Sequence, residues 1–185
     1  MFSQEPAKGK LLIAEPSILN DSSFNRSVIL LSEHNDEGSI GFIINKPSTY
    51  TLGDLIPEIE SDLTIYNGGP VSKENLYFMH RIPDLIPDSL EIANGIYWGG
   101  NFDVVQELLL ANSIDKKDIR FFLGYSGWSK DQLQDELETT SWVVIENDYN
   151  NIFNVSEKSF WKDQLMKFGG EYRIWANAPE NPSLN

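Results

Sequence analysis

The chain has 185 residues, of which 41% are hydrophobic, a formal charge of −14 and no cysteine. A chain of this length buries about 70% of the surface that its unfolded form exposes, so we expect one domain that needs neither a metal nor a disulfide to fold. The lack of cysteine excludes disulfides, thiol catalysis and thiolate metal sites. The acidic charge, with no basic stripe, disfavours direct nucleic-acid binding, because lysine and arginine supply the attraction for phosphate backbones.

The sequence also predicts a location away from membranes. No stretch approaches the roughly 20 consecutive apolar residues that a membrane-spanning helix needs. Residues 1–10 lack the basic segment and long apolar run of a secretory signal. We therefore expect a cytoplasmic protein.

The first half of the chain predicts mainly short strands. Three runs rich in Ile, Val and Leu lack polar alternation, as is typical of strands buried on both faces, and they cover Leu11–Ala14, Ser27–Ser32 and Ile40–Ile44. The polar link at 33–39 indicates a hairpin connection that places His34 on a loop. Thr51 and Asp54 have the spacing of a helix start, which Pro57 limits to one or two turns. Further strands are expected at Leu63–Tyr66, at Leu76–Met79 just before His80, and at Glu91–Trp98.

The second half mixes helices with strands. Asn101 can cap a helix over Phe102–Ala111. A strand at Ile119–Leu123 then leads to a bend at 124–128 and a helix whose start matches a capping box of Ser129 and Gln132. A strand at Trp142–Ile145 follows, and Ser156 can cap a helix with an apolar face of Trp161, Leu165 and Phe168.

These elements predict an α+β fold. Strands and helices alternate without a regular βαβ rhythm, and several links between strands are too short for parallel crossovers. We expect a single domain over residues 1–185, with one or more mixed but largely antiparallel sheets and a few packed helices. Ala176–Asn185 contains two prolines and is predicted to be an extended C-terminal tail.

Three polar residues at the ends of neighbouring predicted strands, Arg26, Asn45 and Lys46, are candidates for a recognition site. An arginine can hold a carboxylate or phosphate through two parallel hydrogen bonds. A structural role is equally open, since Arg26 can pair with Asp21 or Glu33 and Asn45 can cap the turn before Pro47.

The run Gly124–Trp128 is similar in part to the nucleophile elbow of serine hydrolases. An elbow needs glycine two residues after the serine, and Trp128 occupies that position here. The run therefore predicts a glycine-permitted bend with Trp128 in the core, and the functional alternative is anion binding at the start of the following helix.

His34 and His80 are the only histidines in the chain. A Ser-His-Asp relay would need one of them beside Ser27 or Ser126. Residues 33–37 lack the ligand spacing of zinc and calcium sites, so no metal site and no cofactor is predicted.

Motifs that follow one another along nearly the whole chain carry a family resemblance. They include Gly9–Ala14, Arg26–Ile29, Gly41–Pro47, Asn67–Val71, Trp98–Phe102, Gly124–Trp128 and Asn181–Pro182. Together they resemble the YqgE/AlgH family of bacterial proteins, although Asn101 stands where many relatives carry an acidic residue. The resemblance implies an α+β cytosolic protein and brings with it no catalytic residues; one branch of the family carries a transcriptional-regulator label.

The sequence leads to three functional hypotheses. Because no catalytic signature is complete, the first is a non-enzymatic binding or regulatory protein with another protein as its partner. The second is a small-molecule or anion site, with hydrolysis as an option, formed by Arg26, His34, Asn45, His80 and Ser126. The third is a transcriptional regulator that acts on DNA, which the negative charge disfavours.

Overall fold

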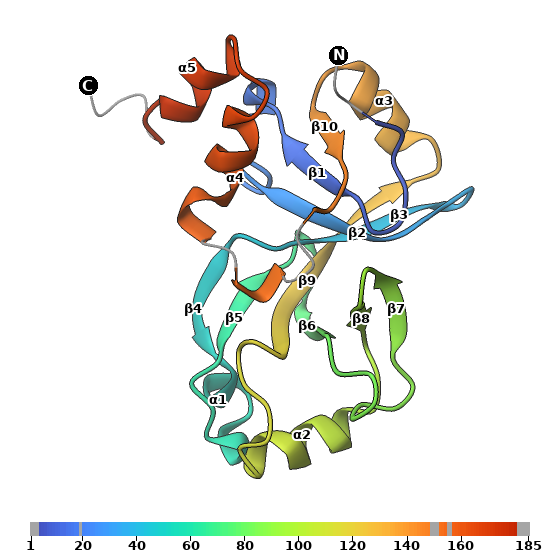
Figure 1. Cartoon of the computed structure of the whole chain (residues 1–185), viewed down its shortest axis with the longest axis vertical. Coiled ribbons are helices and arrows are strands. Elements are labelled where there is room, and N and C mark those ends of the chain that lie inside the picture. The colour runs from blue at the N-terminus through green and yellow to red at the C-terminus, as the bar shows by residue number, and fades with distance from the viewer. Residues whose placement is uncertain (1–3, 19, 149–151, 155–156, 181–185) are drawn as a thin grey trace.

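The computed structural model describes residues 4–18, 20–148, 152–154 and 157–180 (Figure 1). Within these residues, the strands are β1 (Leu11–Ala14), β2 (Val28–Asn35), β3 (Gly38–Ile43), β4 (Pro47–Thr51), β5 (Thr64–Asn67), β6 (Val71–His80), β7 (Leu90–Ala93), β8 (Ile96–Trp98), β9 (Ile119–Ser129) and β10 (Trp142–Ile145). They form one sheet in the order β10-β1-β2-β3-β9-β6-β8-β7, and β4 joins it through β5, which pairs with β9. Of the pairings described, only that of β5 with β9 is parallel.

The helices lie around this sheet. They are α1 (Leu52–Leu55), α2 (Phe102–Leu110), α3 (Gln132–Glu138), α4 (Glu157–Met166) and α5 (Tyr172–Asn177), with short 3₁₀ turns at Pro16–Ile18, Pro57–Ile59 and Ile152–Asn154. Figure 1 shows α4 and α5 beside β1, and α1 and α2 at the opposite end of the molecule. The observed fold is therefore the predicted α+β class, with one domain and a mostly antiparallel sheet.

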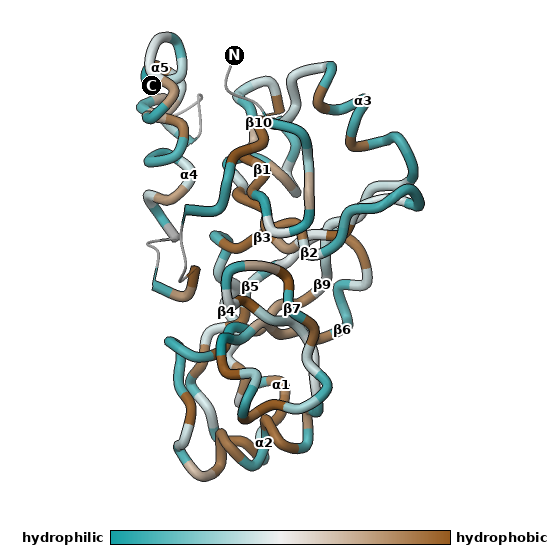
Figure 2. The backbone as a smooth tube through the Cα atoms, turned by 45° about the vertical axis from the view of Figure 1, so that its right-hand side comes forward, coloured by the Kyte–Doolittle hydropathy of each residue, from teal (hydrophilic) through white to brown (hydrophobic). Residues whose placement is uncertain are grey.

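The long strand β9 lies between two hydrophobic clusters. Neighbouring side chains on a strand point to opposite faces. Accordingly Phe121 packs against Phe78, with ring centroids 5.9 Å apart, and Phe122 packs against Phe42 at 5.3 Å. The first pair belongs to the cluster around α1 and α2, and the second to the larger cluster built on β1, β2, β3 and β10. In Figure 2 the hydrophobic parts of the tube concentrate on the strands and on α2.

Local capping signals identified two helix starts correctly. Thr51 and Asp54 form the predicted capping box of α1. The side chain of Asn101 accepts hydrogen bonds from the backbone N–H groups of Asp103 and Val104 at 3.0 and 3.3 Å. Each bond pairs an N–H group that has no partner within its helix.

The loop predicted at 33–39 is instead a continuation of two strands. β2 extends to Asn35 and β3 begins at Gly38, so His34 lies on β2 directly opposite Ser39. The joined ends of β2 and β3 extend away from the rest of the sheet (Figure 1). Their exposed residues are polar, as those of loops are. Polarity alone therefore misplaced His34.

The strand predicted at Glu91–Trp98 is a hairpin of β7 and β8. Its turn residues Asn94 and Gly95 both have positive φ, 53° and 76°. This is the backbone of a two-residue type I′ turn, for which Asn-Gly is the preferred sequence. The Asn-Gly pair in the sequence is therefore the signal that divides this stretch into two strands.

The bend predicted at 124–128 lies within β9. Gly124 has a φ of 69°, and a Cβ atom there would lie 2.6 Å from the Gly69 carbonyl oxygen and 2.8 Å from that of Val71. Glycine is thus needed because another backbone approaches closely, and the strand continues past it. The predicted burial of Trp128 is confirmed. Ser129 donates its N–H to Gln132 Oε1 at 3.0 Å, which is one of the two bonds of the predicted capping box, but α3 begins only at Gln132, after Asp131.

The C-terminal prediction was wrong in its starting point. α5 continues through Asn177 and buries Ala176, so the extended chain begins at Ala178. Residues 181–185 and the predicted cap Ser156 lie outside the described residues. The predicted helix after Ser156 is α4, which carries Trp161 and Leu165 and ends before Phe168.

Candidate functional site

A cleft of about 590 Å³ lies where the loop before β2, the connection from β3 to β4, and the helices α4 and α5 meet. Its lining is mostly polar or charged and consists of Ser22, Asn25, Arg26, Asn45, Lys46, Pro47, Asn67, Lys158, Trp161, Lys162, Ala176 and Glu180. The three residues predicted at strand ends, Arg26, Asn45 and Lys46, therefore do come together.

Asn45 fixes the backbone at one wall of this cleft. Its side chain is 8% exposed, donates from Nδ2 to the Arg26 carbonyl oxygen at 2.9 Å, and accepts at Oδ1 from the Val28 N–H at 2.8 Å. Arg26 has a φ of 55°, a left-handed conformation that is costly for a residue with a side chain. Asn45 thus reaches across to β2, and the expected cap of the turn before Pro47 is not its role.

The Arg26 guanidinium group binds the end of the described chain. Nη2 donates to the Ala178 carbonyl oxygen at 2.7 Å, and Nη1 lies 3.8 Å from Glu180 Oε1. The guanidinium carbon lies 5.1 Å from the ring centroid of Trp161, a cation–π contact. Arg26 therefore has partners far along the chain, and the expected pairing with Asp21 or Glu33 was wrong.

The three lysines of the cleft have different surroundings. Lys46 is partly buried and donates from Nζ to the Ser23 carbonyl oxygen at 2.9 Å. Burial lowers the pKa of the Lys46 ammonium group, and the charge of Asp21 partly opposes that shift. Lys158 and Lys162 are exposed and lie four residues apart on α4, so they share one face of the helix.

Two buried polar atoms of the lining residues have no hydrogen-bond partner among the described residues. They are Asn25 Oδ1 and Arg26 Nε. Buried polar atoms are paired in the large majority of cases. Both atoms are buried and belong to adjacent residues, one an acceptor and the other a donor.

His80 and Ser126 lie elsewhere and are buried. The ring of His80 bonds through Nε2 to the Gly99 carbonyl oxygen and through Nδ1 to the Ile82 N–H, both at 3.2 Å. Burial lowers the pKa of His80, against the opposing effect of the Gly99 bond. The Ser126 hydroxyl donates to the Gly68 carbonyl oxygen at 3.1 Å. Both side chains have structural roles inside the sheet.

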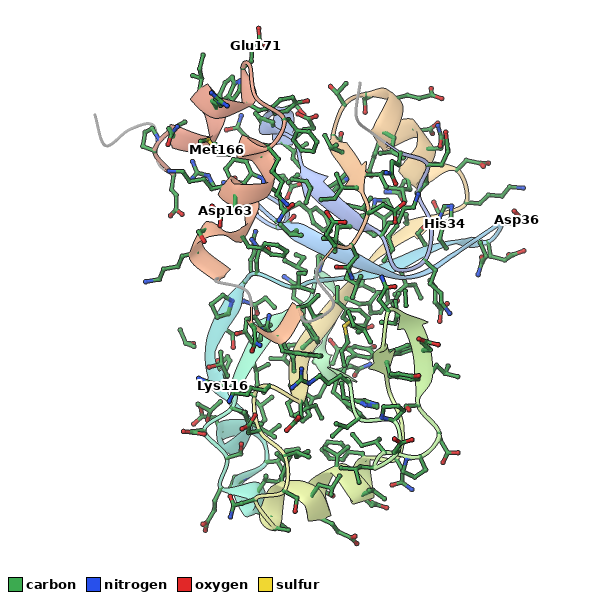
Figure 3. All side chains as sticks on the ribbon, viewed as in Figure 1. His34, Asp36, Lys116, Asp163, Met166 and Glu171 are labelled. Carbon is green, nitrogen blue, oxygen red and sulfur yellow. The ribbon has the colours of Figure 1, made fainter. Side chains whose placement is uncertain are left out.

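His34 is remote from the cleft as well. Figure 3 shows it with Asp36 at the projecting end of β2 and β3, on the other side of the molecule from Asp163, Met166 and Glu171 of the α4 and α5 region. Its Nδ1 lies 2.7 Å from the hydroxyl of Ser39, its partner across the strands. Ser27 donates to the Phe24 carbonyl oxygen at 2.7 Å, so neither serine predicted for a relay contacts a histidine.

Sequence reasoning missed the α4 side of the cleft. Lys158, Trp161 and Lys162 come from a helix that was predicted, and the i, i+4 spacing of the two lysines marked a basic face.

Among the described residues there is no group of three His, Asp or Glu side chains that could hold a metal ion. No helix in the part of the chain that the structure describes has the length and apolar character to span a bilayer.

The structure defines an α+β protein with a mostly antiparallel sheet, and a polar cleft lies where strand ends meet two C-terminal helices. The model of the AlgH-like family matches residues 11–173, and the chain belongs to this family. The resemblance seen in its motifs is thereby confirmed.

Relatives with high coverage agree with this assignment. UPF0301 protein BF2109 of Bacteroides fragilis is 41% identical over 182 residues, which cover 97% of this chain and 92% of the relative. A UPF0301 protein of Cytophaga hutchinsonii is 41% identical over 180 residues, which cover 96% of this chain and 98% of the relative.

Two solved structures have the same fold. The solution structure of the AlgH protein from Pseudomonas aeruginosa has a TM-score of 0.71 at 25% identity, covering 97% of this chain and 98% of that one. The crystal structure of protein DIP2367 from Corynebacterium diphtheriae has a TM-score of 0.73 at 22% identity, covering 96% of this chain and 95% of that one.

Proposed function

We propose that the protein is a non-enzymatic binding protein whose cleft holds an anionic ligand. The observation that supports this most strongly is the gathering of basic side chains. The chain has 14 Lys and Arg against 28 Asp and Glu, yet the described residues that line the cleft include four basic side chains and a single carboxylate, that of Glu180. A positive cleft on an acidic protein attracts anions at short range, which the rest of the surface repels.

The surroundings of two cations favour binding. Arg26 lies against Trp161, whose indole Nε1 donates to the Ala14 carbonyl oxygen at 2.8 Å, so the guanidinium is held in place before a ligand arrives. An arginine that is already positioned loses less entropy when it binds a carboxylate or phosphate. Lys46 is partly buried, and a charge there interacts more strongly than it would in bulk water. The cleft volume also falls in the range of small-molecule sites.

The same contacts favour binding over catalysis. The described lining residues include no imidazole, and the one carboxylate among them, that of Glu180, is largely exposed and lies 3.8 Å from Arg26 Nη1. The serines and histidines considered for hydrolysis are bonded elsewhere in the sheet.

We also propose a cytoplasmic location, in keeping with a chain that has no cysteine. We disfavour DNA as the partner of a regulatory role, because the net charge is −14.

Titration with pyrophosphate and citrate, followed by thermal unfolding and calorimetry, tests this proposal. A ligand at ten times its dissociation constant stabilises the folded protein by about 1.4 kcal/mol. We expect Lys158→Gln with Lys162→Gln to weaken anion binding about tenfold, since each exposed ion pair contributes up to about 1 kcal/mol.

The matched control is Lys116→Gln with Lys117→Gln, which removes the same charge from two exposed lysines outside this cleft. Its affinity for both anions should stay within about twofold of the unmodified protein, since these positions lie beyond contact of the ligand. Equal losses in the two double variants, or an absence of anion binding, would overturn the proposal.

A further inference from the structure

Arg26 in the wall of the cleft already contacts part of the chain itself, the segment Ala178–Glu180, which contains one glutamate. Arg26 holds the backbone carbonyl of Ala178 and approaches the carboxylate of Glu180 with its two terminal nitrogens. Ala178 is extended, with φ −63° and ψ 145°, and Pro179 favours the same extended form. One arginine thus contacts a main-chain carbonyl and a carboxylate two residues further on.

This contact is weak at its charged end. The Glu180 side chain is 87% exposed and its oxygen lies 3.8 Å from Nη1, whereas the Arg26 side chain is 19% exposed. Exposed ion pairs of this kind contribute little to stability, because water and salt screen them. Another carboxylate can therefore replace Glu180 at small cost.

The rest of α5 need not move for such an exchange. Tyr172 donates its hydroxyl hydrogen to Glu15 Oε1 at 2.7 Å, and Ala176 is buried. Burial, together with the bond to Glu15, raises the pKa of Tyr172 to about 12, so this phenol remains a donor at neutral pH. Helix α5 is anchored through Tyr172 to Glu15, the residue after β1, and displacement involves Ala178–Glu180.

The internal segment supplies a single carboxylate to the basic side chains of the cleft. Among the described lining residues Glu180 is the one carboxylate, beside the cations Arg26, Lys46, Lys158 and Lys162, and Asp21 acts on Lys46 from outside the lining. A peptide with several carboxylates complements this set better than a single glutamate does.

We propose that the cleft binds an extended acidic peptide of a partner protein, which replaces the chain's own Ala178–Glu180 segment on Arg26. The partner sequence has a small residue and proline before its first glutamate, as the internal segment does, followed by further acidic residues. The inference rests on the proposed function, since it specifies the anion as a peptide carboxylate.

The test uses the full chain and a fluorescent peptide, Ala-Pro-Glu-Glu-Glu, with Ala-Pro-Gln-Gln-Gln as its neutral counterpart. In fluorescence anisotropy, we expect the acidic peptide to bind and the neutral one to bind at least about tenfold more weakly. Glu180→Gln removes the internal carboxylate and should tighten binding of the acidic peptide about three- to fivefold. The matched control Glu138→Gln removes the same charge from the end of α3 and should change affinity less than about twofold.

The outcomes separate the two proposals. If pyrophosphate binds but the acidic peptide does not, or if Glu180→Gln and Glu138→Gln behave alike, the peptide inference is wrong and the anion cleft stands. Peptide binding that is insensitive to Lys158→Gln with Lys162→Gln places the peptide at another site and also overturns the inference. If neither pyrophosphate nor peptide binds, both proposals fail.

Discussion

Replacing Asn45 with alanine tests whether one side chain maintains the wall of the cleft. The substitution removes the acceptor of the Val28 N–H and the donor to the Arg26 carbonyl oxygen, at 2.8 and 2.9 Å. Val28 is fully buried at the start of β2, so water cannot replace the lost partner there. The Arg26 carbonyl lies in a partly buried residue beside the cleft, where water can reach more easily.

The expected loss of stability follows from these two bonds. A buried backbone group left without a partner costs about 1–3 kcal/mol, and a group that water can reach costs less. We therefore expect Asn45→Ala to lower the free energy of unfolding by about 2–4 kcal/mol. For a chain of this size, the melting temperature should fall by about 4–16 °C.

Urea unfolding followed by circular dichroism measures this difference, and Asn67→Ala is the matched control. Asn67 lines the same cleft but is exposed, so its loss should change stability by less than about 0.5 kcal/mol. If the two alanine variants unfold at the same urea concentration, the role of Asn45 in fixing the backbone of Arg26 and Val28 is refuted.

Two further substitutions test buried features of the sheet. Burial lowers the pKa of His80 in the folded protein. Below about pH 6.5 the unfolded chain therefore takes up a proton at His80 more readily than the folded protein does. The free energy of unfolding should fall on acidification, by at most about 1.4 kcal/mol per pH unit. His80→Gln should flatten this dependence in urea titrations between pH 7.5 and 5, and an unchanged slope would count against the assignment. Gly124→Ala should destabilise by several kcal/mol more than Gly95→Ala, as measured by chemical denaturation. Both glycines have positive φ, but a Cβ atom meets backbone oxygens only at Gly124, so equal losses would show that close approach is unimportant.

Local chemistry made much of the fold predictable. The strands at β1 and β10 are continuous apolar runs, and the starts of α1 and α2 carry capping side chains, so each signal lies within the residues it describes. The course of β9 depends on distant partners. Its residues 126–129 pair with β3, and this pairing keeps a run with two glycines extended although its composition suggests a bend.

The candidate site likewise has a part that local sequence predicts and a part that depends on contacts between distant residues. Arg26, Asn45 and Lys46 were predicted because strand ends collect polar side chains, and neighbouring strands bring those ends together. Their other partners come from α4, which is fixed by contacts such as that of Trp161 with Ala14, 147 positions apart in the sequence. No local pattern encodes that approach. His34, His80 and Ser126 were grouped by chemical type alone, and the sheet distributes them to three separate environments.

The charge of the protein also bears on how a ligand reaches the cleft. At physiological ionic strength, charges separated by more than about 8 Å are largely screened. A bound anion is therefore little affected by distant carboxylates, whereas an approaching anion passes close to the acidic surface and is slowed by it. A free small anion has no other contact that compensates for this repulsion. An acidic segment of a larger protein can be held near the cleft by contacts elsewhere, which raises its effective concentration there. A basic cleft on a chain of charge −14 is for this reason better suited to an attached acidic segment than to a free metabolite.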